Sequence, residues 1–156
     1  MGSKKIKDIM QTDVYSVPYK ATVKEVLQLM VEKEISGVPI VDDENFVIGF
    51  ISDGDIMKFI AKQDPRIIDM TSFITVWYDT ETFEKKLDDL MNLNVMELAT
   101  SKVVSVDEDF EIDEVAKILG KKKIKKVPVL RDGHLVGVVN RSHIIRYIVS
   151  DRLLHK

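Results

Sequence analysis

Ile35-Ser-Gly-Val-Pro-Ile-Val41 is followed 89 positions later by Ile124-Lys-Lys-Val-Pro-Val-Leu130. Each copy sets a Val-Pro pair within a short run of aliphatic residues, a pattern that predicts a buried strand. Similarity at a fixed offset indicates that one structural unit occurs twice.

The offset continues upstream into a predicted helix. The positions with the i, i+3, i+4, i+7 spacing of one buried helical face are Val23, Val26, Leu27 and Met30, and in the second copy Ile112, Val115, Ala116 and Leu119. Thr22 followed by Glu25 predicts a capping-box start for the first helix. The second helix follows the acidic stretch 107–109, whose charges suit a helix N-terminus.

Downstream, each copy has two short apolar strands around a polar turn. The predicted strands are 38–41 and 46–51 in the first copy, and 127–130 and 135–139 in the second. Strands joined so tightly pair antiparallel. A second amphipathic helix follows each pair, at 53–62 and at 141–151. The predicted order of elements in each copy is thus β-α-β-β-α. A domain of about 60 residues is only marginally stable alone, so we expect the two copies to pack as one pseudo-symmetric body.

These features resemble a tandem pair of cystathionine-β-synthase (CBS) domains. The likeness covers residues 6–60 and 95–149, with residues 61–94 as an insertion between the repeats. The resemblance implies an α+β fold of two pseudo-symmetric repeats, called a Bateman module. It also implies a regulatory nucleotide-binding role and a homodimer.

Composition narrows the functional classes. The chain has 156 residues, no Cys and a formal net charge of −3. The lack of Cys excludes disulfides, thiolate metal sites and a Cys nucleophile. From the negative net charge we expect no nucleic-acid partner. No apolar run is long enough to span a membrane and no signal peptide is recognisable, so we expect a cytoplasmic protein.

The resemblance implies that the ligand lies in a cleft between the repeats. The matching motif is Ser52-Asp-Gly-Asp55. An ionised Asp55 accepts hydrogen bonds from both hydroxyls of a ribose, while Ser52 and the helix N–H groups suit a phosphate. The alternative is that Ser52 and Asp55 only cap their helix. The full predicted nucleotide site comprises Ser52, Gly54, Asp55, Lys102, Val104, Ile124, Lys125, Lys126 and Pro128.

The corresponding motif of the second repeat, Asn140-Arg-Ser-His143, has no carboxylate for a ribose. We therefore expect an altered site that binds weakly or stays empty. His143 either contacts an anion in a pH-dependent way or caps its helix. The predicted members of this second site are Asp13, Tyr15, Ile35, Ser36, Asn140, Arg141 and His143, and we expect no metal at either site.

Two further segments stand out. Residues 121–126 contain five lysines at the end of a helix, more than capping needs, and we assign at least one to a ligand phosphate. In the insertion, residues 70–78 predict a strand or lid and residues 81–93 a helix. The insertion either covers a sheet or dimer face, or stacks Trp77 or Tyr78 on the ligand base.

The preferred function is a regulatory module that binds an adenine nucleotide or adenosyl compound, of the AMP, ADP or ATP class, and signals to a partner protein. We expect no cofactor beyond this regulatory ligand and no catalysis. Two alternatives stay open: a dimerisation scaffold without a ligand, and, least favoured, a metal-dependent enzyme using Asp53 and Asp55.

Overall fold

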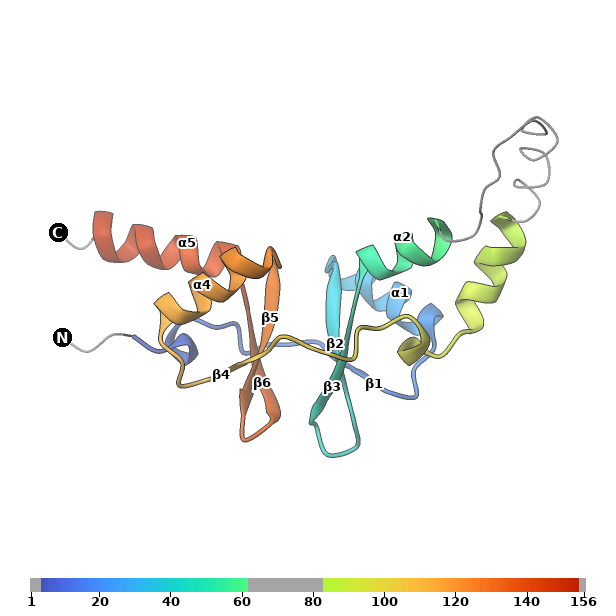
Figure 1. Ribbon diagram of the computed structural model, residues 1–156, viewed down its shortest axis with the longest axis horizontal. Coiled ribbons are helices and arrows are strands. Elements are labelled where there is room, and N and C mark those ends of the chain that lie inside the picture. The colour runs from blue at the N-terminus through green and yellow to red at the C-terminus, as the bar shows by residue number, and fades with distance from the viewer. Residues whose placement is uncertain (1–3, 62–82, 155–156) are drawn as a thin grey trace. The chain divides into compact units, whose positions relative to one another are not determined.

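The computed structural model describes residues 4–61 and 83–154. The first repeat contains η1 (Ile6–Asp8), β1 (Val17–Pro18), α1 (Val23–Lys33), β2 (Gly37–Val41), β3 (Val47–Ser52) and α2 (Asp53–Ala61). The second contains η2 (Val95–Glu97), β4 (Val106–Asp107), α4 (Ile112–Lys122), β5 (Lys126–Arg131), β6 (His134–Asn140), α5 (Arg141–Val149) and η3 (Ser150–Leu154). Residues 83–92 are also helical. The predicted β-α-β-β-α order is confirmed in both repeats (Figure 1).

The strands form two sheets of three strands, β1-β2-β3 and β4-β5-β6. In the second sheet β4 runs parallel to β5, and β5 runs antiparallel to β6, as the short turn predicts. The turn residues Asp132 and Gly133 both have positive φ, 50° and 84°, as a two-residue hairpin requires. A Cβ on Gly133 would lie 2.7 Å from the Phe46 ring, so glycine is needed here for space as well.

The predicted cap is found at the start of α1, whereas the acidic residues before α4 have contacts that the sequence did not predict. Thr22 Oγ1 accepts from Glu25 N at 3.3 Å, which caps α1. At α4 the N-cap is Glu111, and the acidic residues before it serve other contacts. Glu108 pairs with Arg131 (Nε to Oε1, 2.7 Å) and Asp109 pairs with Lys7 (3.0 Å). The helix thus begins after the acidic stretch, as the sequence predicts, while Glu108 and Asp109 each bind a nearby cation.

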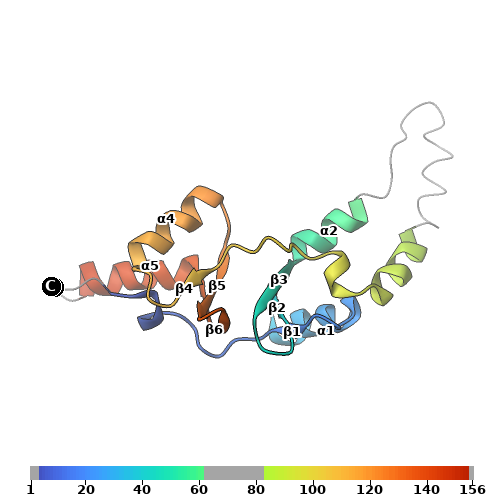
Figure 2. The same ribbon diagram turned by 60° about the horizontal axis from the view of Figure 1, so that its bottom comes forward.

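The predicted helical faces form the core. The confirmed buried positions are Val23, Val26, Met30, Ile112, Val115 and Leu119, none more than 8% exposed. In the second repeat the α4 residues pack with β5, β6 and α5 in one hydrophobic cluster. Figures 1 and 2 show α4 and α5 next to this sheet.

The chain divides into two compact units that do not coincide with the two repeats. Unit 1 comprises Met1–Tyr15, Val41–Val47 and Val103–Lys156, and unit 2 comprises Ser16–Ile40 and Ile48–Lys102. The opening segment of each repeat therefore belongs to the unit that holds the body of the other. Ile6 N donates to Phe110 O at 2.8 Å in unit 1, and the equivalent Val95 N donates to Ala21 O at 2.9 Å in unit 2.

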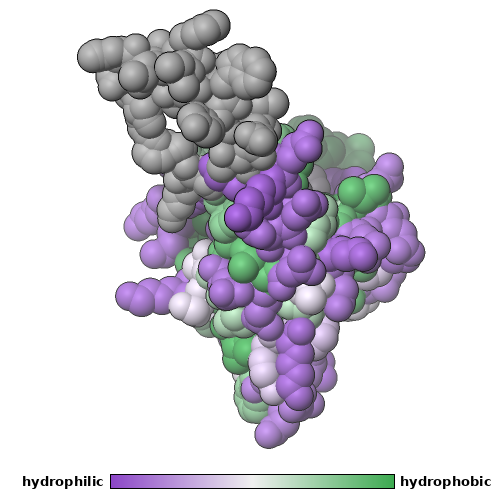
Figure 3. Space-filling view, turned by 90° about the vertical axis from the view of Figure 1, so that its right-hand side faces the viewer, coloured by the Kyte–Doolittle hydropathy of each residue, from purple (hydrophilic) through white to green (hydrophobic). Residues whose placement is uncertain are grey.

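Within the described ranges, no helix is long and apolar enough to cross a membrane. The face shown in Figure 3 is largely hydrophilic, with separate apolar areas between the polar side chains. Large apolar residues that remain exposed in unit 2 include Val31 and Met57.

Candidate functional site

The first predicted motif lies where β3 passes into α2. Asp55 Oδ2 accepts from Ser52 N at 2.9 Å and from Ser52 Oγ at 3.2 Å, so the carboxylate closes the first turn of its helix. Asp53 N donates to Ser36 O at 2.8 Å, which ties the helix start to the residue before β2. Helix capping, the alternative interpretation of this motif, therefore accounts for one oxygen of the Asp55 carboxylate, Oδ2. In the described part of the chain, Oδ1 of Asp55 accepts no hydrogen bond and stays available to a ligand.

The second motif builds the same kind of helix start from different chemistry. Asn140 N donates to His143 Nδ1 at 3.1 Å, and His143 N donates to Asn140 Oδ1 at 3.1 Å. Ser142 Oγ also donates to Asn140 Oδ1, at 2.6 Å. Arg141 N donates to Lys125 O at 3.2 Å, as Asp53 N does to Ser36 O in the first repeat. The imidazole of His143 therefore takes the capping role that the Asp55 carboxylate has.

The environment of His143 favours its neutral form. Burial lowers the pKa of this imidazole, and the nearby charges of Arg146 and Lys126 lower it further. Because Nδ1 accepts a hydrogen bond, the neutral ring carries its proton on Nε2. Of the two interpretations of His143, the structure shows the helix cap.

Cationic groups gather where α4 ends and α5 begins. Lys126 is half-buried at the start of β5, and burial lowers the pKa of its ammonium group. Lys125 is exposed, and Arg141 Nε donates to Ile124 O at 3.1 Å. The positive charge and the α5 N-terminus together suit an anion such as a phosphate.

The residues of the two predicted sites are divided between unit 1 and unit 2. Unit 2 supplies Ile35, Ser36, Ser52, Gly54, Asp55 and Lys102, and unit 1 supplies Asp13, Tyr15, Val104, Ile124, Lys125, Lys126, Pro128, Asn140, Arg141 and His143. Contacts within a unit join Ser52 to Asp55, Asn140 to His143, and Arg141 to both Ile124 and Lys125. Pro128 is buried, whereas Lys102 and Ser36 are exposed. The pairing of residues across the two repeats stays a prediction.

Several contacts were not foreseen from the sequence. Phe46 and His134, one from each predicted hairpin, lie with ring centroids 4.3 Å apart in unit 1. Leu135 N donates to Asn45 O at 3.1 Å beside them. These contacts join two turns that are about 90 residues apart in the sequence. The sequence feature that could have indicated them is an apolar residue, Phe46, next to a polar turn.

Within the insertion, the structure describes residue 61 and residues 83–94. The predicted helix over residues 81–93 is found at residues 83–92, where Leu90 is buried. The predicted strand over residues 70–78, with Trp77 and Tyr78, lies outside the described residues. Among the residues described, no group of three His, Asp or Glu side chains is placed to hold a metal ion.

Comparison with known proteins adds independent findings. The family model for the CBS domain matches residues 6–62 and 95–150. The uncharacterized protein MJ1426 of Methanocaldococcus jannaschii is 29% identical over 92% of this chain and 90% of its own length. The chloroplastic CBS domain-containing protein CBSX1 of Arabidopsis thaliana is 30% identical over 86% of this chain, which spans 58% of CBSX1.

Two solved structures share the fold. The CBS domain pair of protein MJ0100, in complex with 5-methylthioadenosine and S-adenosyl-L-methionine, has a TM-score of 0.71 and 22% identity, covering 97% of this chain and 100% of its own. CBSX2 in complex with AMP has a TM-score of 0.72 and 22% identity, covering 95% of this chain and 98% of its own. The similarity confirms the predicted α+β fold of two repeats.

Proposed function

The chain belongs to the CBS domain family, and from that premise we propose that it binds one adenine nucleotide or adenosyl compound and reports the occupied state to a partner protein. It is a regulatory module rather than an enzyme. The related domain pairs bound to AMP, to 5-methylthioadenosine and to S-adenosyl-L-methionine support an adenosyl ligand.

The observation that carries the proposal is the asymmetry between Asp55 and His143. Ser52 holds the Asp55 carboxylate through Oδ2, which leaves Oδ1 available for the hydroxyls of a ribose. His143 already uses Nδ1 as an acceptor, and its Nε2 is a donor, so it cannot accept from a ribose. Asp55 is therefore the ribose-binding residue in this proposal, and the site around His143 stays weak or empty.

The rest of the proposed site would hold the base and the phosphate. Val104 and Ile124 are half-buried aliphatic side chains suited to the face of a base. Lys125 and Lys126 supply positive charge for the phosphate. Because Lys126 is half-buried and its pKa is lowered by that burial, a bound anion would stabilise its charged form.

A thermal-shift panel tests the ligand class directly. AMP, ADP, ATP, S-adenosylmethionine and 5-methylthioadenosine are each added to the full chain. A ligand at 100 times its dissociation constant adds about 2.7 kcal/mol of stability, which raises the melting temperature by several degrees at this length. If no adenosyl compound shifts the melting temperature, the proposal fails and a ligand-free dimerisation scaffold becomes the better description.

The proposal also includes a homodimer. The exposed apolar side chains that continue from α5 into η3 support it, because a monomer leaves them in water.

A further inference from the structure

Helices α1 and α4 end in the same backbone conformation but carry different charges there. Each has 11 residues and is followed by a cap residue in the left-handed region, Glu34 at φ 55° and Lys123 at φ 54°. Residues 32–34 are Glu-Lys-Glu, whereas residues 121–123 are Lys-Lys-Lys. One cation is therefore enough to complete this kind of helix end, and the additional lysines of α4 need another explanation.

More positive charge lies beside the end of α4. Arg141 is the first residue of α5; its backbone N–H donates to Lys125 O at 3.2 Å, and its Nε–H donates to Ile124 O at 3.1 Å. These bonds hold the start of α5 against the residues that follow α4, all within unit 1. We define the basic surface as five exposed residues: Lys121, Lys122, Lys123, Lys125 and Arg141.

The first repeat builds the same backbone arrangement with the opposite charge. Asp53 N donates to Ser36 O at 2.8 Å, as Arg141 N does to Lys125 O, so these positions correspond in the two repeats. The positions equivalent to the basic surface are Glu32, Lys33, Glu34, Ser36 and Asp53. The first repeat thus has one cation and three carboxylates where the second has five cations. Because the same fold forms with either set, the fold itself does not require the basic surface.

The charge of the basic surface is not balanced by carboxylates of the same chain. Within residues 4–61 and 83–154, none of its five residues forms an ion pair. A positive potential in this region is also felt by His143, whose pKa is lowered by burial and then by the nearby charges of Arg146 and Lys126. Unbalanced cations of this kind attract an acidic partner.

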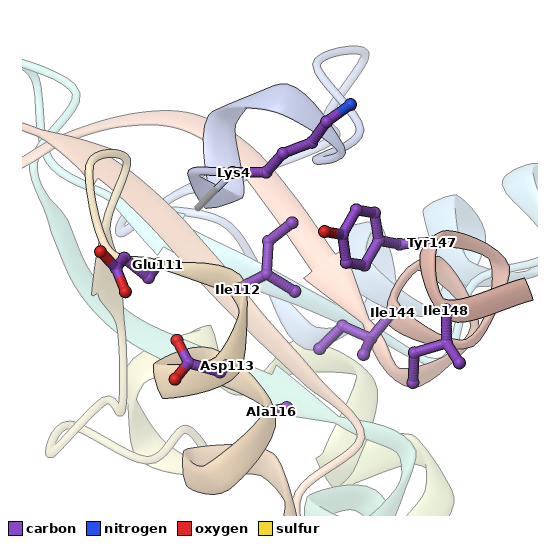
Figure 4. A pocket seen from close by; sticks show the side chains of 8 residues that line it. All are labelled: Lys4, Glu111, Ile112, Asp113, Ala116, Ile144, Tyr147 and Ile148. Carbon is purple, nitrogen blue, oxygen red and sulfur yellow. The ribbon is translucent and has the colours of Figure 1, made fainter. Parts of the chain in front are cut away.

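The opposite end of α4 is acidic, which limits the length of such a partner. Asp113 and Glu114 lie in the first turn of the helix. Figure 4 shows the carboxylates of Glu111 and Asp113 at this end, turned away from the apolar side chains that line a cavity of about 350 Å³. Asp113 precedes Lys121 by eight residues, or about 12 Å along a helix. A long polyanion such as nucleic acid would meet these carboxylates, whereas a short acidic segment would not.

The chemistry of the basic surface suits carboxylates better than a phosphate. The end of α4 presents carbonyl oxygens, so a phosphate finds no backbone N–H donors at residues 121–123. Lysine ammonium groups are point charges on long, flexible side chains. Each of them can therefore meet a separate carboxylate of an acidic protein segment.

We propose that the basic surface binds a short acidic segment, rich in Asp and Glu, of the partner protein. The equivalent surface of the first repeat does not bind this segment, because its carboxylates repel it. The inference rests on the part of the proposed function that names a partner protein, and it gives that partner a docking surface and a chemistry.

Fluorescence anisotropy of the full chain with a labelled hexaglutamate peptide, at about 0.15 M salt, tests the basic surface. The central variant combines Lys121→Glu with Lys123→Glu, which gives α4 the Glu-Lys-Glu end of α1. The fold is retained, because Glu34 already occupies the same left-handed position in α1. We expect the dissociation constant of the peptide to rise by about tenfold or more. The matched control combines Lys24→Glu with Lys58→Glu, the same change in net charge on exposed residues of unit 2, and should weaken binding far less.

Three results would overturn the basic surface. They are a wild-type chain that does not bind the peptide, an equal loss of affinity in the two double variants, and tighter binding of a short DNA duplex than of the peptide. The proposed ligand is tested separately, because neither Lys121 nor Lys123 belongs to the proposed nucleotide site. The central variant should therefore keep the thermal shift of the wild type with nucleotides. Peptide binding without any nucleotide shift would leave the basic surface standing and overturn the proposed ligand.

Discussion

The Nδ1 atom of His143 accepts a hydrogen bond from the backbone N–H of Asn140 at 3.1 Å, the position at which Asp55 Oδ2 accepts from Ser52 N in the first repeat. A neutral imidazole can accept this bond, whereas an imidazolium cannot. The start of α5 therefore depends on the protonation state of one histidine, and that of α2 on a carboxylate.

This difference predicts a pH dependence of stability. Burial and nearby cations hold the pKa of His143 below its usual value, while in the unfolded chain it returns to about 6.5. At a pH between the folded and unfolded pKa values, the unfolded chain binds more protons than the folded chain. The contribution of His143 to the free energy of unfolding is therefore complete above a pH of about 6.5 and decreases as the pH falls below it. Urea unfolding at several pH values across this window measures the loss.

The control for this prediction is His143→Asp, which keeps an acceptor at the helix start but titrates at a much lower pH. Its free energy of unfolding should change less across the same window. Equal slopes in the two proteins would show that His143 does not cause the pH dependence of the wild type.

Replacing Asp55 should weaken ligand binding. Asp55→Asn keeps an acceptor for Ser52 N and removes the charge, so the helix cap survives while the ribose contact is lost. A charge-assisted hydrogen bond contributes ~1.5–3 kcal/mol, and we expect the dissociation constant to rise by at least ~10-fold. Calorimetry with the nucleotide that shifts the melting temperature most is the measurement.

The companion variant is His143→Ala, which should change the affinity far less. The same titration gives the stoichiometry, and we expect one nucleotide per chain. Two equal sites per chain, or an unchanged dissociation constant in Asp55→Asn, would mean that Asp55 serves only its helix.

The core of the second repeat should be sensitive to the loss of one side chain. Leu119 is 2% exposed and belongs to the main hydrophobic cluster, so Leu119→Ala should cost about 2–5 kcal/mol of unfolding free energy. Lys122, three residues on, is exposed, and Lys122→Ala should stay within about 0.5 kcal/mol. Similar urea midpoints for the two variants would contradict the assigned packing of α4.

Two glycines should respond in opposite directions to the same substitution. Gly133 has a positive φ, and a Cβ at this position would lie 2.7 Å from the Phe46 ring. Gly133→Ala should therefore destabilise the fold by more than about 1 kcal/mol. At Gly120 a Cβ meets no atom within 4 Å, and Gly120→Ala should stabilise the helix by roughly 0.5–1 kcal/mol. Thermal unfolding of both variants decides the matter, and a loss of stability in Gly120→Ala would show that its surroundings are not open.

The sequence alone was sufficient for the repeat, the element order and the main buried positions of α1 and α4. The reason is that periodicity is a local property: Val23, Val26 and Met30 lie on one side of any helix they form, and the apolar side is the one removed from water. The Val-Pro strands and their turns follow from equally local preferences.

The tertiary structure decided which distant residues meet. Ile6 and Val95 each begin a helix of three residues, which is too short to show a periodic pattern. The sequence therefore did not indicate that the opening segment of each repeat belongs to the unit that contains most of the other repeat. Glu108 was expected to serve the nearby helix, but the Arg131 guanidinium, 23 residues away, offers two donors to its carboxylate. His143 had two interpretations because a histidine can donate or accept, and only the orientation of its ring toward Asn140 N distinguishes them.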